Sequence, residues 1–213
     1  MRINFLGDSI TAGASAETLD GRYSSLVAKA FGAEEYNFGI GGTRIARQAE
    51  IKDYVDDKHF LTRAIQMPTD ADFTFVFGGT NDYGHGDAKL GVFEDTNPYT
   101  FYGAMRELTA YMVGRFPKNK LCFILPIHRY GEDNPYGDGR KEEAGAPLSV
   151  YVEAEKKVLD EYGVEYLDLS DRFYIPTVNT DDGNLYKDGL HPNAKGHKVL
   201  AECLIEYLKN KGF

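Results

Sequence analysis

The chain has 213 residues, with 33 acidic and 24 basic side chains and a formal net charge of −9. Its 42% hydrophobic and 27% charged residues are ordinary for a globular protein and argue against intrinsic disorder. The negative charge, without any run of Lys or Arg, argues against nucleic acids and anionic membranes as partners, because binding to either requires a positively charged protein surface. The length predicts one domain spanning residues 1–213.

The two cysteines, Cys122 and Cys203, lie in an apolar run and in a helical pattern. Both are expected to be buried thiols of a reduced protein. No stretch approaches the roughly 20 apolar residues that a membrane span needs, and the N-terminus lacks the basic and apolar regions of an export signal. We therefore expect a cytoplasmic protein that does not associate with membranes.

Five short apolar runs, rich in β-branched or aromatic residues, predict buried parallel strands at residues 3–6, 36–38, 73–77, 121–125 and 166–169. Segments of helical period occupy residues 101–116, residues 147–162 and the chain after Asn193. This alternation requires right-handed crossovers between parallel strands. The predicted fold is α/β, a three-layer α/β/α sandwich of the flavodoxin type whose five-stranded sheet has the order 2-1-3-4-5.

Three long segments, residues 83–99, 128–146 and 170–187, are rich in Gly, Asp and Tyr, and each follows a predicted strand. Ligands of open α/β sheets bind beyond the carboxyl ends of the strands. Loops of this length in a compact domain are usually functional. The binding site is therefore expected at this rim of the sheet.

The block Gly7-Asp8-Ser9-Ile10-Thr11 directly follows the first predicted strand. A serine at such a turn projects its hydroxyl from the carboxyl edge of the sheet, where it can serve as a nucleophile. An N-cap is the more common structural role, and this short motif alone favours it. The chain contains no G-x-S-x-G elbow.

Two further blocks follow the second and third strands, at residues 37–43 and 78–82. Gly41 and Gly42 allow backbone N–H groups to approach a phosphate or an oxyanion, and Asn81 can offer its side-chain amide. Tight turns and Asx turns account for the same residues structurally.

The segment 187–193 contains Asp188 and His191, three positions apart. Within a turn, the carboxylate can accept from Nδ1–H of the imidazole and leave Nε2 free as a base. Pro192 biases His191 toward an extended backbone just before the last helix. The pair is expected at the rim that also carries Ser9, Gly42 and Asn81.

These four blocks, in this order, resemble the SGNH hydrolases, the GDSL esterase/lipase family, over nearly the whole chain. The resemblance implies that Ser9 is the nucleophile and that Asp188 and His191 complete a catalytic triad. It also implies that the Ser9 N–H, Gly42 and Asn81 form the oxyanion hole. Neither a metal nor an organic cofactor is implied.

Four other rim residues are candidates for lining the acyl or leaving-group pocket, although surface positions account for them equally well: Tyr83, His85, His128 and Arg129. The remaining histidines have structural interpretations, His59 on a solvated face and His197 packed on the last helix. Tyrosines are frequent in the rim loops and could stack on a sugar. They are Tyr83, Tyr99, Tyr102, Tyr130, Tyr136, Tyr174 and Tyr186.

The sequence thus predicts a serine esterase that acts through an acyl-enzyme on short-chain, especially acetyl, esters of a small or carbohydrate substrate. The alternatives are a lysophospholipase or thioesterase of the same family, a non-catalytic sugar- or phosphate-binding module, and a metallophosphoesterase. The oligomeric state is left open.

Acidic residues in the rim loops predict a negatively charged mouth that disfavours strongly anionic esters. They are Asp87, Glu94, Asp95, Glu132, Asp133, Asp138, Asp181 and Asp182.

Overall fold

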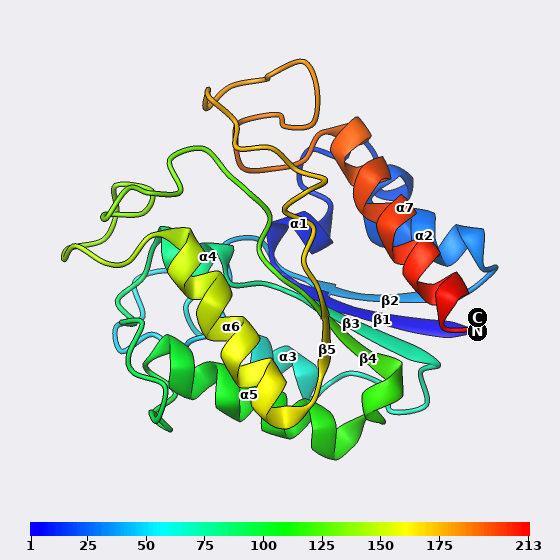
Figure 1. Ribbon diagram of the computed structural model, residues 1–213, viewed down its shortest axis with the longest axis horizontal. Coiled ribbons are helices and arrows are strands. Elements are labelled where there is room, and N and C mark those ends of the chain that lie inside the picture. Colours follow the sequence, from blue (N-terminus) through cyan, green and yellow to red (C-terminus); the bar gives the residue numbers. More distant parts are fainter.

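A computed structural model describes residues 1–213 of the protein. Its five strands are all parallel and follow the order β2-β1-β3-β4-β5 (Figure 1). They are β1 (Arg2–Gly7), β2 (Glu34–Gly39), β3 (Phe73–Phe77), β4 (Leu121–Ile124) and β5 (Glu165–Leu167). The predicted fold class and strand order are confirmed. β2 starts two residues earlier than expected, and β5 ends at Leu167 instead of continuing to residue 169.

Helices cover both faces of the sheet (Figure 1). One face carries α2 (Tyr23–Ala30) and α7 (Ala194–Asn210), and the other carries α3 (Phe60–Ala64), α5 (Phe101–Arg115) and α6 (Leu148–Tyr162). Two short helices, α1 (Ser9–Ala12) and α4 (Thr80–Gly84), and the 3₁₀ turns Leu19–Gly21 and Lys118–Lys120 complete the elements. None of the helices combines the length and the apolar character needed to cross a membrane.

The long helices begin where the sequence predicts. The Thr100 hydroxyl caps α5 by accepting from the N–H of Gly103, and the Asn193 side chain caps α7 by accepting from Lys195 and Gly196. Gly163, in the left-handed conformation, ends α6.

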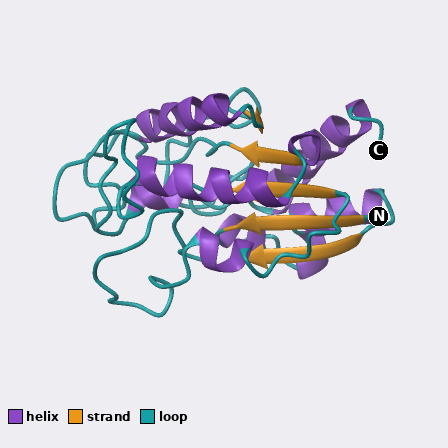
Figure 2. Ribbon diagram, turned by 90° about the horizontal axis from the view of Figure 1, so that it is seen from below, coloured by secondary structure: helices purple, strands orange, loops and turns teal.

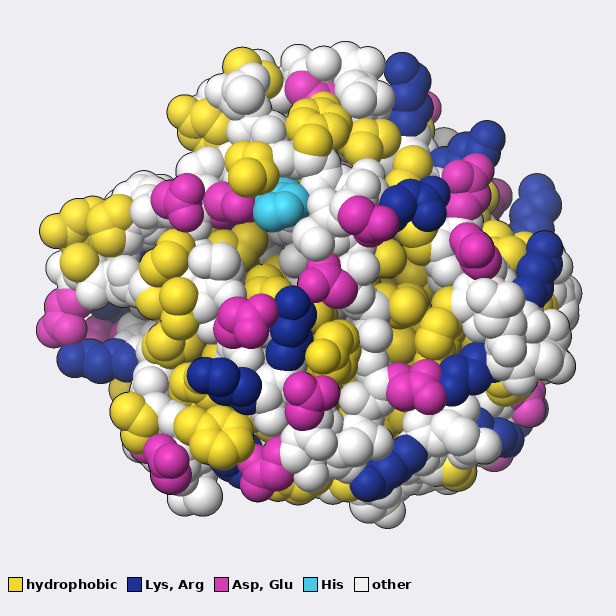
Figure 3. All heavy atoms as spheres, viewed as in Figure 1, with side chains coloured by type: hydrophobic (Ala, Val, Ile, Leu, Met, Phe, Trp, Pro, Cys, Tyr) yellow, Lys and Arg dark blue, Asp and Glu magenta, His cyan; other side chains and the backbone are white.

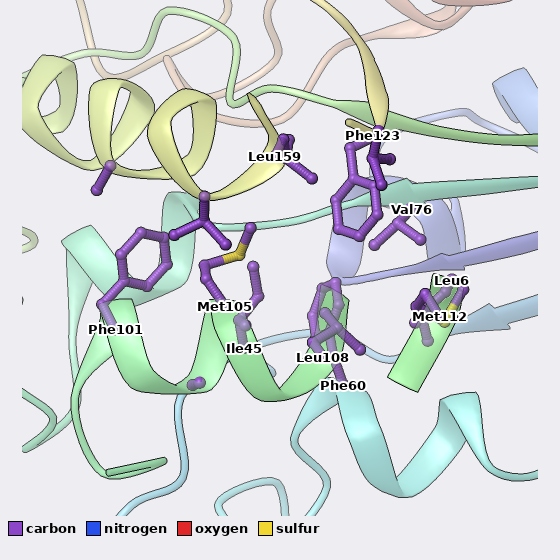
Figure 4. Close-up of a cluster of buried hydrophobic side chains, with 14 of the residues drawn as sticks. Leu6, Ile45, Phe60, Val76, Phe101, Met105, Leu108, Met112, Phe123 and Leu159 are labelled. Atoms are coloured by element: carbon purple, nitrogen blue, oxygen red, sulfur yellow. The ribbon is translucent and has the colours of Figure 1, made fainter. Parts of the chain in front are cut away.

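Two apolar clusters hold the helices on the sheet. Alternate β3 residues face opposite ways, so that Phe73, Phe75 and Phe77 pack toward α2 and α7, while Val76 packs toward α5 and α6. Figure 4 shows the cluster on the α5 and α6 side of the sheet, where side chains of α5 pack against Leu159 of α6 and against the strands. Both Cys122 and Cys203 are buried free thiols, as expected.

The long connections gather at the carboxyl ends of the strands, the end to which the arrows point in Figure 2, and both termini lie at the opposite end. Gly7 at the end of β1 pairs with Gly39 at the end of β2 and with Phe77 at the end of β3. The strands therefore end level with one another, and the segments that follow them emerge side by side.

Candidate active site

Ser9 occupies the first turn after β1, at the start of α1. Asp8, rather than Ser9, is the N-cap, since its carboxylate accepts from the N–H of Ile10 at 3.0 Å. The capping role that the short motif favoured for Ser9 is therefore wrong, and the Ser9 hydroxyl is free for another partner. Close packing positions this turn: a Cβ on Gly39 would lie 2.3 Å from the backbone N of Ala12.

The partner of Ser9 is His191. Its Nε2 lies 2.9 Å from Ser9 Oγ, and its Nδ1 lies 2.7 Å from Asp188 Oδ2. Because a carboxylate only accepts hydrogen bonds, Nδ1 carries the proton in the neutral ring, and the lone pair of Nε2 faces the Ser9 hydroxyl. The three side chains predicted to work together thus form one continuous chain of hydrogen bonds.

The turn that carries Asp188 and His191 is closed by a backbone hydrogen bond from Lys187 N–H to the His191 carbonyl at 2.9 Å. Within it, Asp188 Oδ1 accepts from the N–H groups of His191 at 2.7 Å and Leu190 at 3.1 Å. Partial burial opposes ionisation, but the hydrogen bonds from the ring and backbone of His191 lower the pKa of Asp188 to about 2. The carboxylate is therefore charged whenever the imidazole is a base.

Gly42 lies in the segment that follows β2 and adopts a left-handed backbone, with φ +75°. Its N–H makes no hydrogen bond within the protein, and Gly42 lines the same cavity as Ser9, whereas Gly41 does not. The N–H of Gly41 is likewise without a partner in the protein, so lining of the cavity is the one observation that distinguishes Gly42 from Gly41.

Asn81 follows β3 and is buried in α4. Its Nδ2 donates to the carbonyl of Thr43 at 3.0 Å, which leaves the second N–H of the amide without an acceptor. The next residue, Asp82, accepts from the N–H groups of Ile45 at 2.9 Å and Ala46 at 2.8 Å. These contacts fix the segment after Gly42 against α4.

Ser9, Gly42, Asn81, Asp188 and His191 line one cavity of about 730 Å³. Most of its wall is backbone and polar side chains, and only three of the lining residues are hydrophobic: Ala14, Tyr130 and Leu190. No three His, Cys, Asp or Glu side chains in the structure come together as they would around a metal ion. We call this cavity the catalytic pocket.

Residues 5–199 match the GDSL-like lipase/acylhydrolase family. The protein belongs to this family. A Lactobacillus plantarum protein of known structure is 32% identical, with a TM-score of 0.80 over 98% of this chain and 96% of the other. No protein of curated function matches the sequence.

More distant structures share the fold. A carbohydrate acetylesterase from Sinorhizobium meliloti is 16% identical, with a TM-score of 0.67 over 98% of both chains. A member of the lipolytic G-D-S-L family from Veillonella parvula is 17% identical, with a TM-score of 0.63 over 98% of both chains.

Arg63, which the sequence did not single out, connects two of the four blocks in this GDSL-family hydrolase, those that follow β1 and β2. Its buried guanidinium donates to the carbonyls of Gly7 and Phe38 and, at 2.7 Å, to the hydroxyl of Thr43. Burial lowers the pKa of Arg63 to about 10, so it remains charged. The only sequence signal is an arginine within an apolar stretch, residues 60–65.

Two of the four predicted pocket residues line the catalytic pocket. His85 lies with Nε2 3.2 Å from the Gly42 carbonyl and Nδ1 3.2 Å from Asp138, and the buried Arg129 also pairs with Asp138. The prediction is wrong for the other two. Tyr83 is 1% exposed and donates to the carbonyl of Gly131 below the surface, and His128 turns to Glu132.

The remaining aromatic and histidine predictions have mixed outcomes. His197 is packed as expected, stacked on Tyr23 and hydrogen-bonded to the Ala14 carbonyl. His59, expected on a solvated face, is instead half-buried at the N-cap position of α3. Of the rim tyrosines, only Tyr130 lines the catalytic pocket, while three of the others are buried: Tyr83, Tyr102 and Tyr186.

The prediction that acidic loop residues surround the mouth of the pocket is wrong. Of the eight loop carboxylates, only Asp138 lines the catalytic pocket, and it is paired with Arg129. Arg140 contributes a second cation to the same wall. On the face in Figure 3, basic and acidic side chains are likewise interspersed. The net charge of the chain is therefore not concentrated at the pocket.

Proposed function

We propose that this hydrolase is a serine esterase that cleaves carboxylic esters through an acyl-enzyme, acting on acetyl or other short-chain esters of a small or carbohydrate substrate. The observation that carries the proposal is the chain from Asp188 through His191 to Ser9, with distances of 2.7 and 2.9 Å. A binding module has no need for a hydroxyl held against a base that is itself oriented by a carboxylate.

In the first half-reaction, Ser9 Oγ attacks the acyl carbon while its proton passes to His191 Nε2. Asp188 keeps the ring in the required tautomer and stabilises the imidazolium. The negative charge on the tetrahedral oxygen is met by the N–H groups of Ser9 and Gly42 and by the free N–H of Asn81. The first N–H groups of a helix lack intrahelical acceptors, which leaves that of Ser9 available.

His191 then gives its proton to the oxygen of the leaving alcohol, and the acyl group remains as an ester on Ser9. In the second half-reaction, water attacks this ester and its proton passes to Nε2. The tetrahedral intermediate collapses, the carboxylic acid leaves, and Ser9 Oγ regains a proton from the ring.

The wall of the catalytic pocket supports a short acyl group. A long alkyl chain would have to lie against glycine backbone and the polar groups of Asn134, Arg129 and Arg140, and removing these groups from water without new hydrogen bonds is costly. An acetyl group needs only a small apolar contact, which Ala14 and Leu190 offer. The fold shared with a carbohydrate acetylesterase adds support.

Labelling with a fluorophosphonate probe and hydrolysis of p-nitrophenyl acetate together test the proposal. We expect the wild type to be labelled on Ser9 and to hydrolyse the ester in the presence of EDTA. S9A should lose both the label and turnover while keeping its thermal unfolding transition. Wild-type turnover by purified S9A would refute the assignment.

The alternatives predict different results. A binding module would take no label, and a metallophosphoesterase would lose activity with EDTA. A p-nitrophenyl ester series from acetate to decanoate separates an acetylesterase from a lysophospholipase or long-chain thioesterase. We expect kcat/KM to be highest at acetate or propionate and to fall with each longer chain.

A further inference from the structure

A second cavity, of about 840 Å³, opens beside the catalytic pocket and has no part in the proposed chemistry. Its walls come from three segments, residues 41–56, 85–91 and 140–146, with Tyr151 of α6 behind them. We call it the side chamber. Its volume lies within the range of small-molecule binding sites.

The side chamber adjoins the catalytic pocket. Gly42, His85 and Arg140 line both cavities. Gly42 belongs to the proposed oxyanion hole, and the His85 ring stands between Asp138 and the Gly42 carbonyl, 3.2 Å from each. The two cavities therefore meet at the wall that His85 forms, and the proposal requires that a substrate with its ester at Ser9 extend past this ring into the chamber.

Charges of both signs line the side chamber. Lys52 contacts Glu50 and Glu142, and Lys89 contacts Glu143. An alkyl chain in such a chamber would take these groups out of water, which is unfavourable. A strongly anionic ligand would face several carboxylates, which is also unfavourable.

Hydroxyl groups suit this wall, since each can donate to a carboxylate and accept from an ammonium or guanidinium group. Two further residues that line the chamber, Arg140 and Tyr54, have side chains that are available to contact a ligand. Arg140 makes no hydrogen bond or ion pair within the protein. Tyr54 is 74% exposed and offers an aromatic surface that can cover the C–H face of a sugar ring.

We propose that the side chamber binds a glycosyl unit of an acetylated oligosaccharide, next to the sugar whose acetyl ester lies at Ser9. The inference rests on the proposed esterase function and adds a requirement to it. The preferred substrate has at least two sugar units, and the second unit provides binding energy remote from the reacting ester.

The test measures acetate release from singly acetylated xylose, xylobiose and xylotriose and from the corresponding glucose series, with p-nitrophenyl acetate as a reference that is too small to span both cavities. For the wild type, we expect kcat/KM to rise at least tenfold from the mono- to the disaccharide in at least one series. A ratio near one in both series would overturn the proposal.

Three variants locate the effect. Y54A removes the aromatic surface, and A144W fills the chamber from an exposed loop position. We expect each to reduce the ratio of disaccharide to monosaccharide kcat/KM at least fivefold. The control Y99A alters an exposed tyrosine outside both cavities and should keep the wild-type ratio. A wild-type ratio in both Y54A and A144W would overturn the proposal.

The experiments distinguish a failure of the glycosyl-binding proposal from a failure of the esterase proposal. A wild type that hydrolyses p-nitrophenyl acetate and labels on Ser9 but shows no gain from a second sugar refutes only the chamber. A wild type that does neither refutes the esterase proposal, and with it the chamber as a part of that site.

Discussion

Replacing Asp188 with Asn tests the proposed triad with little change in shape. In the wild type, Oδ1 accepts from two backbone N–H groups, of Leu190 and His191, while Oδ2 accepts from the imidazole. The backbone donors hold the amide oxygen of D188N in place of Oδ1, so that its NH₂ group faces Nδ1. The ring then accepts at Nδ1 and carries its proton on Nε2, toward Ser9 Oγ.

Such a ring is in the wrong tautomer to take a proton from Ser9. The expected loss in kcat is about 10⁴-fold, or about 5 kcal/mol of transition-state stabilisation. Stability should change far less. The depressed pKa of Asp188, about 2 against 3.8, corresponds to roughly 2 kcal/mol, and since 46% of the side chain is exposed, solvent screening reduces this to about 1 kcal/mol.

The assay is steady-state hydrolysis of p-nitrophenyl acetate at pH 8, together with urea unfolding of D188N and the wild type. An Asn that precedes a Gly deamidates readily and would restore the aspartate, so the intact mass of D188N is measured alongside each rate. If mass-verified D188N kept more than a tenth of wild-type kcat, the role of Asp188 in orienting His191 would be refuted.

Three further predictions concern groups around the triad. N81A should lower kcat for p-nitrophenyl acetate by about 10² to 10³, or about 2.7 to 4 kcal/mol, and a loss below fivefold would exclude Asn81 from the oxyanion hole. R63M leaves the Gly7 and Phe38 carbonyls without their buried donor, so the free energy of unfolding measured in urea should fall by about 2 to 5 kcal/mol. An unchanged free energy of unfolding would show that these contacts do not stabilise the fold. Burial raises the pKa of Asp8 from 3.8 to about 6, so the folded state keeps a proton that the unfolded chain loses, and this contribution to stability disappears as the pH rises from about 4 to 6. As the pH rises across this range, the free energy of unfolding of D8N should therefore increase relative to that of the wild type by up to about 3 kcal/mol. A difference between the two proteins that is independent of pH would contradict the raised pKa.

Local patterns in the sequence were sufficient for the fold. The Phe73 to Phe77 run is buried on both sides because helices cover both faces of the sheet, and Asn193 and Thr100 cap their helices through bonds to residues two or three positions away. Such contacts depend on neighbours in the chain, which is why spacing predicts them. The contact between Asp188 and His191 is of the same kind.

Loop side chains were predicted less well. Tyr83 and His85 follow the same strand, yet Tyr83 turns under the 128–146 loop and His85 turns toward Gly42. Their sequence surroundings do not distinguish the two directions, because each depends on which distant loop packs above the residue. The same reason explains why the acidic loop residues did not produce an acidic pocket.

The sequence by itself determined the order of the elements and the residue types at the ends of the strands, since both follow from hydrophobic period and short-range hydrogen bonding. Only the tertiary structure decided that Ser9 is free because Asp8 caps α1, that Arg63 connects the blocks after β1 and β2, and that a side chamber adjoins the catalytic pocket. Each of these depends on contacts between segments far apart in the chain. Such contacts exist only once the strands have aligned their carboxyl ends.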